Sequence, residues 1–154
     1  MYGWHCLPVP GRRLPANVID VIAAAQLLRK AVPGIQAIAL VGSWARAAGG
    51  PESDVDLVVL TSEPDALLAD DATSWFRIFG ADVELIRCAD FGLLQERRLR
   101  RSDGLVVEVA IGAPDWAATD PPDAGSARVV RDGMRILFDP EQLLSGIAKA
   151  TEAS

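Results

Sequence analysis

The sequence contains only one histidine and two cysteines in 154 residues, which limits the chemistry that it can perform. The histidine, His5, lies close to the start of the chain, so a histidine-based zinc site or a Ser-His-Asp triad is excluded by inventory. Cys6 and Cys88 are too few for a disulfide framework and lack the spacing of a metal-binding motif. We therefore expect a protein of the reducing cytoplasm.

Basic residues are also scarce, since 15 Lys and Arg stand against 21 Asp and Glu for a net charge of -6. Extended binding to nucleic acid needs a basic face, so we do not expect it. No stretch reaches the roughly 18 apolar residues that a membrane span requires. The first dozen residues contain Pro8 and Pro10 and no apolar core segment, which argues against a signal peptide.

What is present is a globular composition, with 50% hydrophobic and 23% charged residues over the length of one domain, 1–154. The apolar patterning predicts an α+β fold, a small mixed sheet flanked by helices on one side. An irregular arm (1–14) precedes a motif-bearing core (35–111) and a C-terminal hairpin and helix (112–154). The expected helices are 15–32 with Asn17 as its cap, a broken one over 65–79, and 139–148. The expected strands are 35–41, 54–60, 82–88, the hairpin 94–101 and 105–111, and a second hairpin of 128–130 and 134–138.

Asp54 and Asp56 stand at the start of an otherwise apolar strand. Residues at i and i+2 of a strand project from one face, so the two carboxylates repel each other and lose hydration where the strand enters the core. A hard divalent cation that takes oxygens from both is the simplest compensation, and magnesium suits this role because it also takes phosphate oxygens. The alternative is that Asp54 caps a turn and Asp56 is exposed at a strand end.

Glu108 is the only charged residue in the apolar run from Leu105 to Ile111. A buried carboxylate needs a cation, a proton or the rim of a cleft, because an unpaired charge in a core strand is costly. Glu108 is therefore a candidate third acid beside the two aspartates. Glu84 and Glu96 are weaker competitors, since both lie in more polar stretches.

The hairpin register offers another partner for Glu108. If Asp103 and Gly104 form a two-residue turn, Leu99 lies opposite Glu108. Arg97 and Arg101 then lie diagonally on the same face, and either could form a salt bridge with the carboxylate.

Gly42 and Ser43 directly follow the apolar run 35–41 and open a short segment that we expect to be helical. Glycine permits close backbone approach, the hydroxyl adds a donor, and the start of a helix offers free N–H groups to an anion. Phosphate fits such a corner, and Arg46 could add a charge-assisted contact. A purely structural turn is the alternative. Trp44 is near enough to stack on a base, although partial burial in the core is the more common role of tryptophan.

Taken together, the residues Gly42-Ser43-Trp44-Ala45-Arg46, then Ser53-Asp54-Val55-Asp56-Leu57, then an isolated acid in a later strand form one pattern. It closely resembles the polymerase-beta-like nucleotidyltransferase superfamily, in particular its small bacterial members. The resemblance covers about residues 35–111. Two positions depart from the pattern, because Ala47 stands where many relatives have glycine and Glu108 where the third acid is often aspartate.

The resemblance implies a metal-dependent transfer of a nucleoside monophosphate from a nucleoside triphosphate to an acceptor hydroxyl, with release of pyrophosphate. Asp54 and Asp56 would hold two magnesium ions, with manganese as the alternative metal. Glu108 would complete the metal site or act as the general base.

The resemblance also assigns the nucleotide phosphates to Gly42, Ser43, Arg46 and Ser53, with ATP as the expected nucleotide. The acceptor is a small molecule or a protein, and a homodimer or a partner protein would complete the cleft. The alternative is a catalytically silent module that binds a nucleotide or a partner, including an antitoxin-like role, on the same fold.

Overall fold

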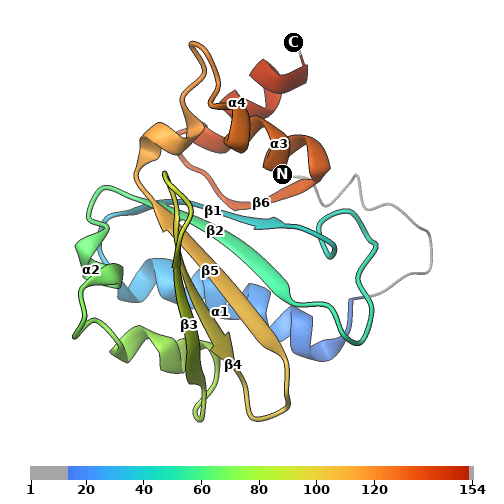
Figure 1. The fold of residues 1–154 in the computed structure, drawn as a ribbon, viewed down its shortest axis with the longest axis vertical. Coiled ribbons are helices and arrows are strands. Elements are labelled where there is room, and N and C mark those ends of the chain that lie inside the picture. Colours follow the sequence, from blue (N-terminus) through green and yellow to red (C-terminus); the bar gives the residue numbers. More distant parts are fainter. Residues whose placement is uncertain (1–13, 153–154) are drawn as a thin grey trace.

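A computed structural model describes residues 14–152 and shows one six-stranded sheet with helices packed on it (Figure 1). The expected arm, 1–14, lies outside the described residues except for Leu14. The helices are α1 Ala16–Ala31, α2 Asp65–Leu68, α3 Ala124–Asp132 and α4 Leu143–Glu152, with short 3-10 helices η2 Ser74–Phe79 and η3 Pro114–Ala117. The strands are β1 Ile35–Val41, β2 Val55–Thr61, β3 Glu84–Asp90, β4 Gln95–Arg100, β5 Val106–Gly112 and β6 Met134–Phe138.

The strand order is β3-β4-β5-β2-β1-β6, and β2 pairs with β5 in parallel while the other neighbouring pairs are antiparallel. The predicted α+β class with a mixed sheet is confirmed. The apolar runs 35–41 and 105–111, together with the run after Asp56, form three adjacent strands at the centre of the sheet. The side chains of β1 and β2 are buried on both faces along most of their length, which is typical of central strands, whereas buried and partly exposed residues alternate along most of β5.

Helix α1 forms where the apolar residues recur every three or four positions, and Val18, Val21, Ala25 and Leu28 are buried. Its N-cap is Pro15, with no side-chain cap hydrogen bond, so the predicted cap at Asn17 is wrong. The helix ends before Pro33, because the residue that precedes a proline disfavours the helical conformation.

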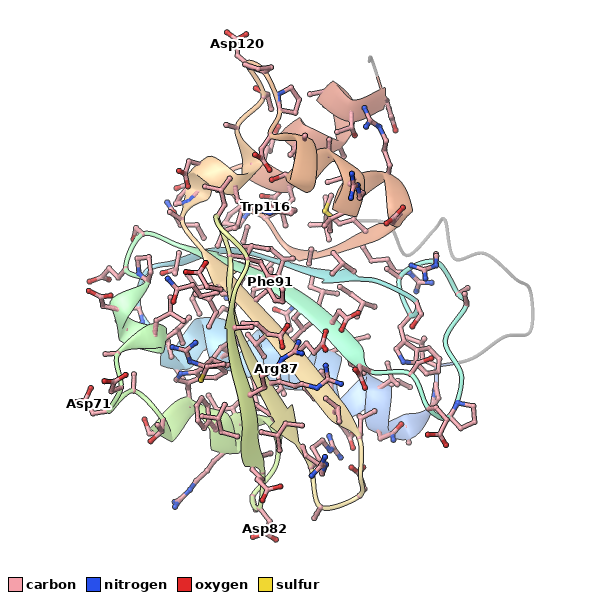
Figure 2. All side chains as sticks on the ribbon, in the orientation of Figure 1. Asp71, Asp82, Arg87, Phe91, Trp116 and Asp120 are labelled. Carbon is pink, nitrogen blue, oxygen red and sulfur yellow. The ribbon has the colours of Figure 1, made fainter. Side chains whose placement is uncertain are left out.

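Helices cover both faces of the sheet, where we expected them on one side. On one face α1 and η2 pack on a core that includes Ile38, Leu40, Leu57 and Val109. On the other face η3, α3 and α4 pack over β1 and β2, and Trp116 is buried in that second core with Leu60 (Figure 2). This second helical layer lies over the β6-β1-β2 part of the sheet.

The C-terminal segment departs from the prediction, because the second hairpin does not form. Residues 124–132 are the helix α3, whose N-cap Asp123 accepts a hydrogen bond from the Ser126 N–H at 2.9 Å. Gly133, with a φ of 131°, ends that helix, and β6 then pairs with β1 instead of with residues 128–130. The last helix starts at Leu143, four residues after the predicted start at Asp139, whose buried carboxylate accepts hydrogen bonds from the Leu144 and Ser145 N–H groups.

Among residues 14–152, no helix combines the length and the apolar character needed to cross a bilayer.

Candidate active site

The fold brings Asp54, Asp56 and Glu108 together on one face of the sheet. Asp56 and Glu108 are register partners across the parallel pair β2 and β5, and partner residues project to the same side. Asp54 directly precedes β2 and lies two residues from Asp56, on the same side. The side chains of Asp54 and Glu108 are 30% and 22% exposed, so the acids sit in a partly open region of the sheet surface.

Arg98 lies between two of these acids. Its Nη2 atom donates to Asp54 Oδ2 at 2.7 Å, and its Nη1 atom donates to Glu108 Oε1. The arginine is the register partner of Glu108 on the antiparallel strand β4. The salt bridge that we considered for Glu108 therefore exists, but it involves neither Arg97 nor Arg101.

The difference comes from the length of the hairpin loop. The Arg101 N–H donates to the Leu105 carbonyl and the Gly104 N–H to the Arg101 carbonyl, so the loop has three residues, 102–104, and not the two on which the register with Leu99 opposite Glu108 depended. Gly104 adopts a φ of 89°, as the last residue of such a loop requires. One additional loop residue shifts the register by one position, which places Arg98 and not Leu99 opposite Glu108.

Arg97 and Arg101 consequently have structural roles. Arg97 projects to the opposite face and donates from Nη2 to the carbonyl of Leu68 at 3.0 Å. Arg101 pairs with Asp103 at 3.1 Å and with Asp20 of α1 at 3.6 Å.

The electrostatics of the site are dominated by Asp56. Burial raises the pKa of Asp56 to about 8, and a hydrogen bond with Glu108 and the negative charges of Glu108, Asp54 and Glu96 add to the effect. Burial also raises the pKa of Asp54, although the positive charge of Arg98 opposes this. The Asp56 Oδ1 atom is buried and has no hydrogen-bond partner among the described residues.

The chemistry of these side chains suits a hard divalent cation. Three carboxylates supply only oxygen ligands and one buried oxygen is unsatisfied. Burial and the neighbouring negative charges, which together raise the pKa of Asp56, disfavour an ionised carboxylate that a bound cation would stabilise. Within residues 14–152, however, no three such side chains are already arranged to hold a metal ion. The guanidinium of Arg98 occupies oxygens of Asp54 and Glu108 that a cation would need.

The turn at Gly42 and Ser43 belongs to the same site. Gly42 has a φ of 74°, and a Cβ atom at this position would lie 2.3 Å from Asp56 Oδ2, so only glycine fits beside the carboxylate. The segment after Ser43 is a turn and not the predicted short helix: the Ala45 and Arg46 N–H groups both donate to the Gly42 carbonyl, and Ala47 has a φ of 59°. The Gly42-Ser43 turn and the Asp56 carboxylate are therefore in direct contact.

The other predicted phosphate ligands lie in this turn and in the loop that follows it. Arg46 is exposed. Ser53 Oγ accepts a hydrogen bond from the Gly50 N–H at 2.9 Å, which closes the loop that leads into β2. The roles of Ser43, Arg46 and Ser53 toward phosphate stay predictions.

Two supporting contacts were not found from the sequence. Arg135 of β6 is buried and donates from Nε to the carbonyl of Ala45 at 3.1 Å, which fixes the turn from the C-terminal side. Trp44 is buried, donates from Nε1 to the Ser53 carbonyl at 3.5 Å, and packs so closely on Gly49 that a Cβ atom there would lie 2.2 Å from the ring. Trp44 is thus part of the core, which leaves it unsuited to stack on a base.

Glu96 and Arg87 form a second charged pair beside the acids. Glu96 is the same-face neighbour of Arg98 on β4 and is 4% exposed, and Arg87 of β3 donates to it from Nε at 3.1 Å and from Nη2 at 2.7 Å. Arg87 lies near the middle of the view in Figure 2. Glu108 is the register partner of Asp56, whereas Glu96 lies on β4, one strand further from β2, so Glu108 is the better candidate for the third acid.

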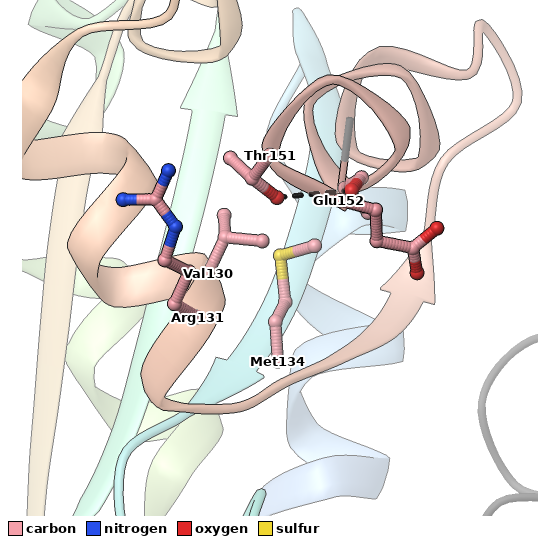
Figure 3. A pocket seen from close by; sticks show the side chains of 6 residues that line it. Val130, Arg131, Met134, Thr151 and Glu152 are labelled. Carbon is pink, nitrogen blue, oxygen red and sulfur yellow. Dashed lines mark hydrogen bonds between the residues drawn. The ribbon is translucent and has the colours of Figure 1, made fainter. Parts of the chain in front are cut away.

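A separate hollow of about 470 Å³ lies among α3, β6 and α4 (Figure 3). It is lined by Val130, Arg131, Met134, Ala148, Thr151 and Glu152. None of the predicted site residues contributes to it, so it does not compete with the acidic face as the candidate site.

Comparison of the sequence with known protein families identifies the class of protein. Residues 23–111 match the family described as "Nucleotidyltransferase domain", and this range contains the Gly42-Ser43 turn and all three acids. The match covers more than half of the chain, and the chain belongs to this family. No curated protein matches the chain at a significant level.

Proposed function

We propose that this protein transfers a nucleoside monophosphate from ATP or another nucleoside triphosphate to a hydroxyl group of a small molecule or a protein, in a reaction that depends on magnesium or manganese. The observation that carries the proposal is the meeting of Asp54, Asp56 and Glu108 on one sheet face, in contact with the Gly42 turn. Family membership supports nucleotidyl transfer in general.

In this proposal Asp54 and Asp56 would hold two divalent ions, and Glu108 would complete the site. When bound, the ions would stabilise the negative charge that develops on the attacking and leaving oxygens of the α-phosphate. Asp56 supplies the buried oxygen that lacks a partner, and ligation would keep this carboxylate ionised.

The other residues bind and orient the substrates. The backbone of the Gly42-Ser43 turn would receive the β- and γ-phosphates, and Arg46 would add a positive charge from its exposed position. The acceptor oxygen forms a bond to the α-phosphorus while the bond to the bridging oxygen breaks, and pyrophosphate leaves. Glu108 would accept the proton of the acceptor hydroxyl as the alternative to completing the metal site.

The acceptor would approach over the part of the sheet formed by β3, β4 and β5. On this side the C-terminal helices pack on β1 and β2 (Figure 1). The side chains of Glu84, Arg87 and Arg100 are at least half exposed. The surface beside the acids is therefore charged and accessible, which suits a polar acceptor.

The test measures transfer of label from α-labelled ATP with magnesium to a panel of small hydroxyl compounds and to a protein extract. The wild-type chain, Asp56→Asn, Glu108→Gln and the exposed loop control Asp82→Asn would be compared. We expect transfer by the wild type and the control, and a loss of at least about a hundredfold in the two site variants, since even residues that only support metal ligands cost 10–100-fold. Equal transfer by Asp56→Asn and the wild type would contradict the proposal.

A silent nucleotide- or partner-binding module is the second candidate, and one observation favours it. Arg98 already neutralises part of the acidic cluster, as a structural ion pair would. Calorimetric titration with ATP and magnesium, combined with the transfer assay, separates the two, because a silent module that binds nucleotide gives heat of binding but no label transfer with any acceptor.

A further inference from the structure

Arg98 makes the most specific contact in the candidate site. One guanidinium nitrogen binds Asp54 and the other binds Glu108, so a single side chain connects two of the three acids. Its side chain is 26% exposed, similar to the two acids that it connects. The third acid, Asp56, receives no such hydrogen bond on Oδ1.

We propose that Arg98 competes with the divalent cation for Asp54 and Glu108, and that its side chain leaves these two carboxylates before they bind metal. This inference rests on the proposed function and adds to it a residue, Arg98, that controls access of the metal to Asp54 and Glu108.

The competition follows from the ligand atoms. The Asp54 Oδ2 and Glu108 Oε1 atoms accept hydrogen bonds from Arg98, and the same lone pairs would have to face a cation. The guanidinium cannot lose its proton at any accessible pH, so its positive charge can be removed from the site only by moving the side chain. A dication and a guanidinium on the same two carboxylates would also repel each other.

The structure allows the side chain to move while the backbone stays. Arg98 sits in the middle of β4, held on one side by pairing with Glu108 of β5 and on the other by pairing with Arg87 of β3. Arg98 belongs to neither hydrophobic core and part of its side chain is exposed, so the side chain can rotate toward solvent without unpacking either core. The competition is therefore a matter of side-chain rotation, and the sheet need not open.

Arg100 provides a matched control on the same strand. It lies two residues further along β4, on the same face, and forms an ion pair with the exposed Glu84 at 3.4 Å. Removing Arg100 removes one positive charge near the site but no contact with the three acids. The comparison separates direct competition from the general effect of charge.

The test is the titration of the nucleotide-free chain with Mn²⁺, followed by electron paramagnetic resonance of the free ion and by calorimetry. We expect Arg98→Met and Arg98→Ala to bind Mn²⁺ about tenfold more tightly than the wild type, which corresponds to about 1.4 kcal/mol. The Mn²⁺ affinity of Arg98→Lys should lie between those of the wild type and Arg98→Ala, because an ammonium keeps the charge but cannot form the bidentate contact. Arg100→Ala should stay within about twofold of the wild type, as screening of exposed charges predicts.

Thermal unfolding gives a second readout and checks that the variants fold. With a chelator present, Arg98→Met should melt at a lower temperature than the wild type, because the acids lose their counter-charge. With the same Mn²⁺ concentration its melting temperature should rise by more, since stabilisation grows with the ratio of ligand concentration to Kd.

Unchanged or weaker Mn²⁺ binding in both Arg98→Met and Arg98→Ala, with the wild type binding Mn²⁺, would overturn the inference and leave the proposed function standing. An equal gain in Arg100→Ala would overturn it as well, because the effect would then be one of charge alone. If neither the wild type nor any variant binds Mn²⁺, the metal-dependent function fails and the inference fails with it.

Discussion

Asp56 and Glu108 lie opposite each other on the parallel strands β2 and β5, although they are 52 positions apart in the chain. Their carboxyl groups share one partly buried surface, and this proximity is among the causes that raise the pKa of Asp56 to about 8, after burial itself. The ionic state of the site therefore depends on a strand pairing that only the folded chain provides.

The first prediction concerns stability as a function of pH without metal. In the unfolded chain Asp56 ionises near its ordinary value of 3.8, and in the folded chain at about 8. Between these values the folded state binds more protons, so this group favours folding at low pH and its contribution is lost as the pH rises from about 4 to about 8. The contribution of Asp56 to the free energy of unfolding, measured by urea denaturation of the wild type in EDTA, should therefore fall across this pH range.

The variant Asp56→Asn isolates that contribution, because asparagine resembles the protonated acid and does not titrate. Its stability curve should be flatter than that of the wild type over the same pH range, with the difference largest near pH 8. Asp82→Asn, which changes an exposed loop residue, should leave the slope as it is. Parallel curves for the wild type and Asp56→Asn would show that the folded-state pKa is not raised.

The second prediction uses the contact between Gly42 and Asp56. Gly42→Ala should destabilise the chain for two reasons: a φ of 74° is strained for alanine, and the added Cβ would lie 2.3 Å from Asp56 Oδ2. Gly92→Ala is the matched control, since Gly92 has a φ of 80° but open space around a Cβ. Strain alone should cost about 1–2 kcal/mol in both, and the clash should add about 1–3 kcal/mol in Gly42→Ala.

Chemical denaturation measures both variants, and Mn²⁺ titration shows whether the clash displaces Asp56. Equal losses of stability in Gly42→Ala and Gly92→Ala would mean that the glycine at 42 serves backbone conformation only. The turn and the carboxylate would then be independent features.

The composition of the acidic cluster could be predicted from the sequence, but its counter-charge could not. Asp54 and Asp56 precede an apolar run, and Glu108 interrupts another, so all three stand out against their surroundings. Arg98 lies among other arginines in the run 97–101, and only the register decides which of them faces Glu108. That register depends on whether the loop before Leu105 has two or three residues, which the Asp-Gly pair alone does not determine.

The wrong prediction of a hairpin over 128–130 and 134–138 has a similar origin. Arg131-Asp132-Gly133 is compatible with a hairpin turn and also with the end of a helix, because glycine with a positive φ serves both. The helix is favoured by the cap at Asp123 and by the pairing of β6 with β1. That pairing is a long-range contact, and no local pattern in the sequence reveals it.

The last prediction concerns Ala47, where the chain has alanine and many relatives of the resembled superfamily have glycine. Ala47 adopts a φ of 59°, a left-handed conformation that costs an alanine about 1–2 kcal/mol, whereas glycine adopts it freely at an entropic cost of about 0.5–1 kcal/mol. Ala47→Gly should therefore raise the free energy of unfolding by about 0.5–1 kcal/mol, measured by urea denaturation at constant pH. The neighbouring Ala48→Gly is the control, because Ala48 is exposed and is not among the residues with positive φ, so the same change should lower stability. A loss of stability in both variants would show that the turn after Ser43 does not hold residue 47 in the left-handed region, and glycine in the relatives would then need an explanation other than backbone strain.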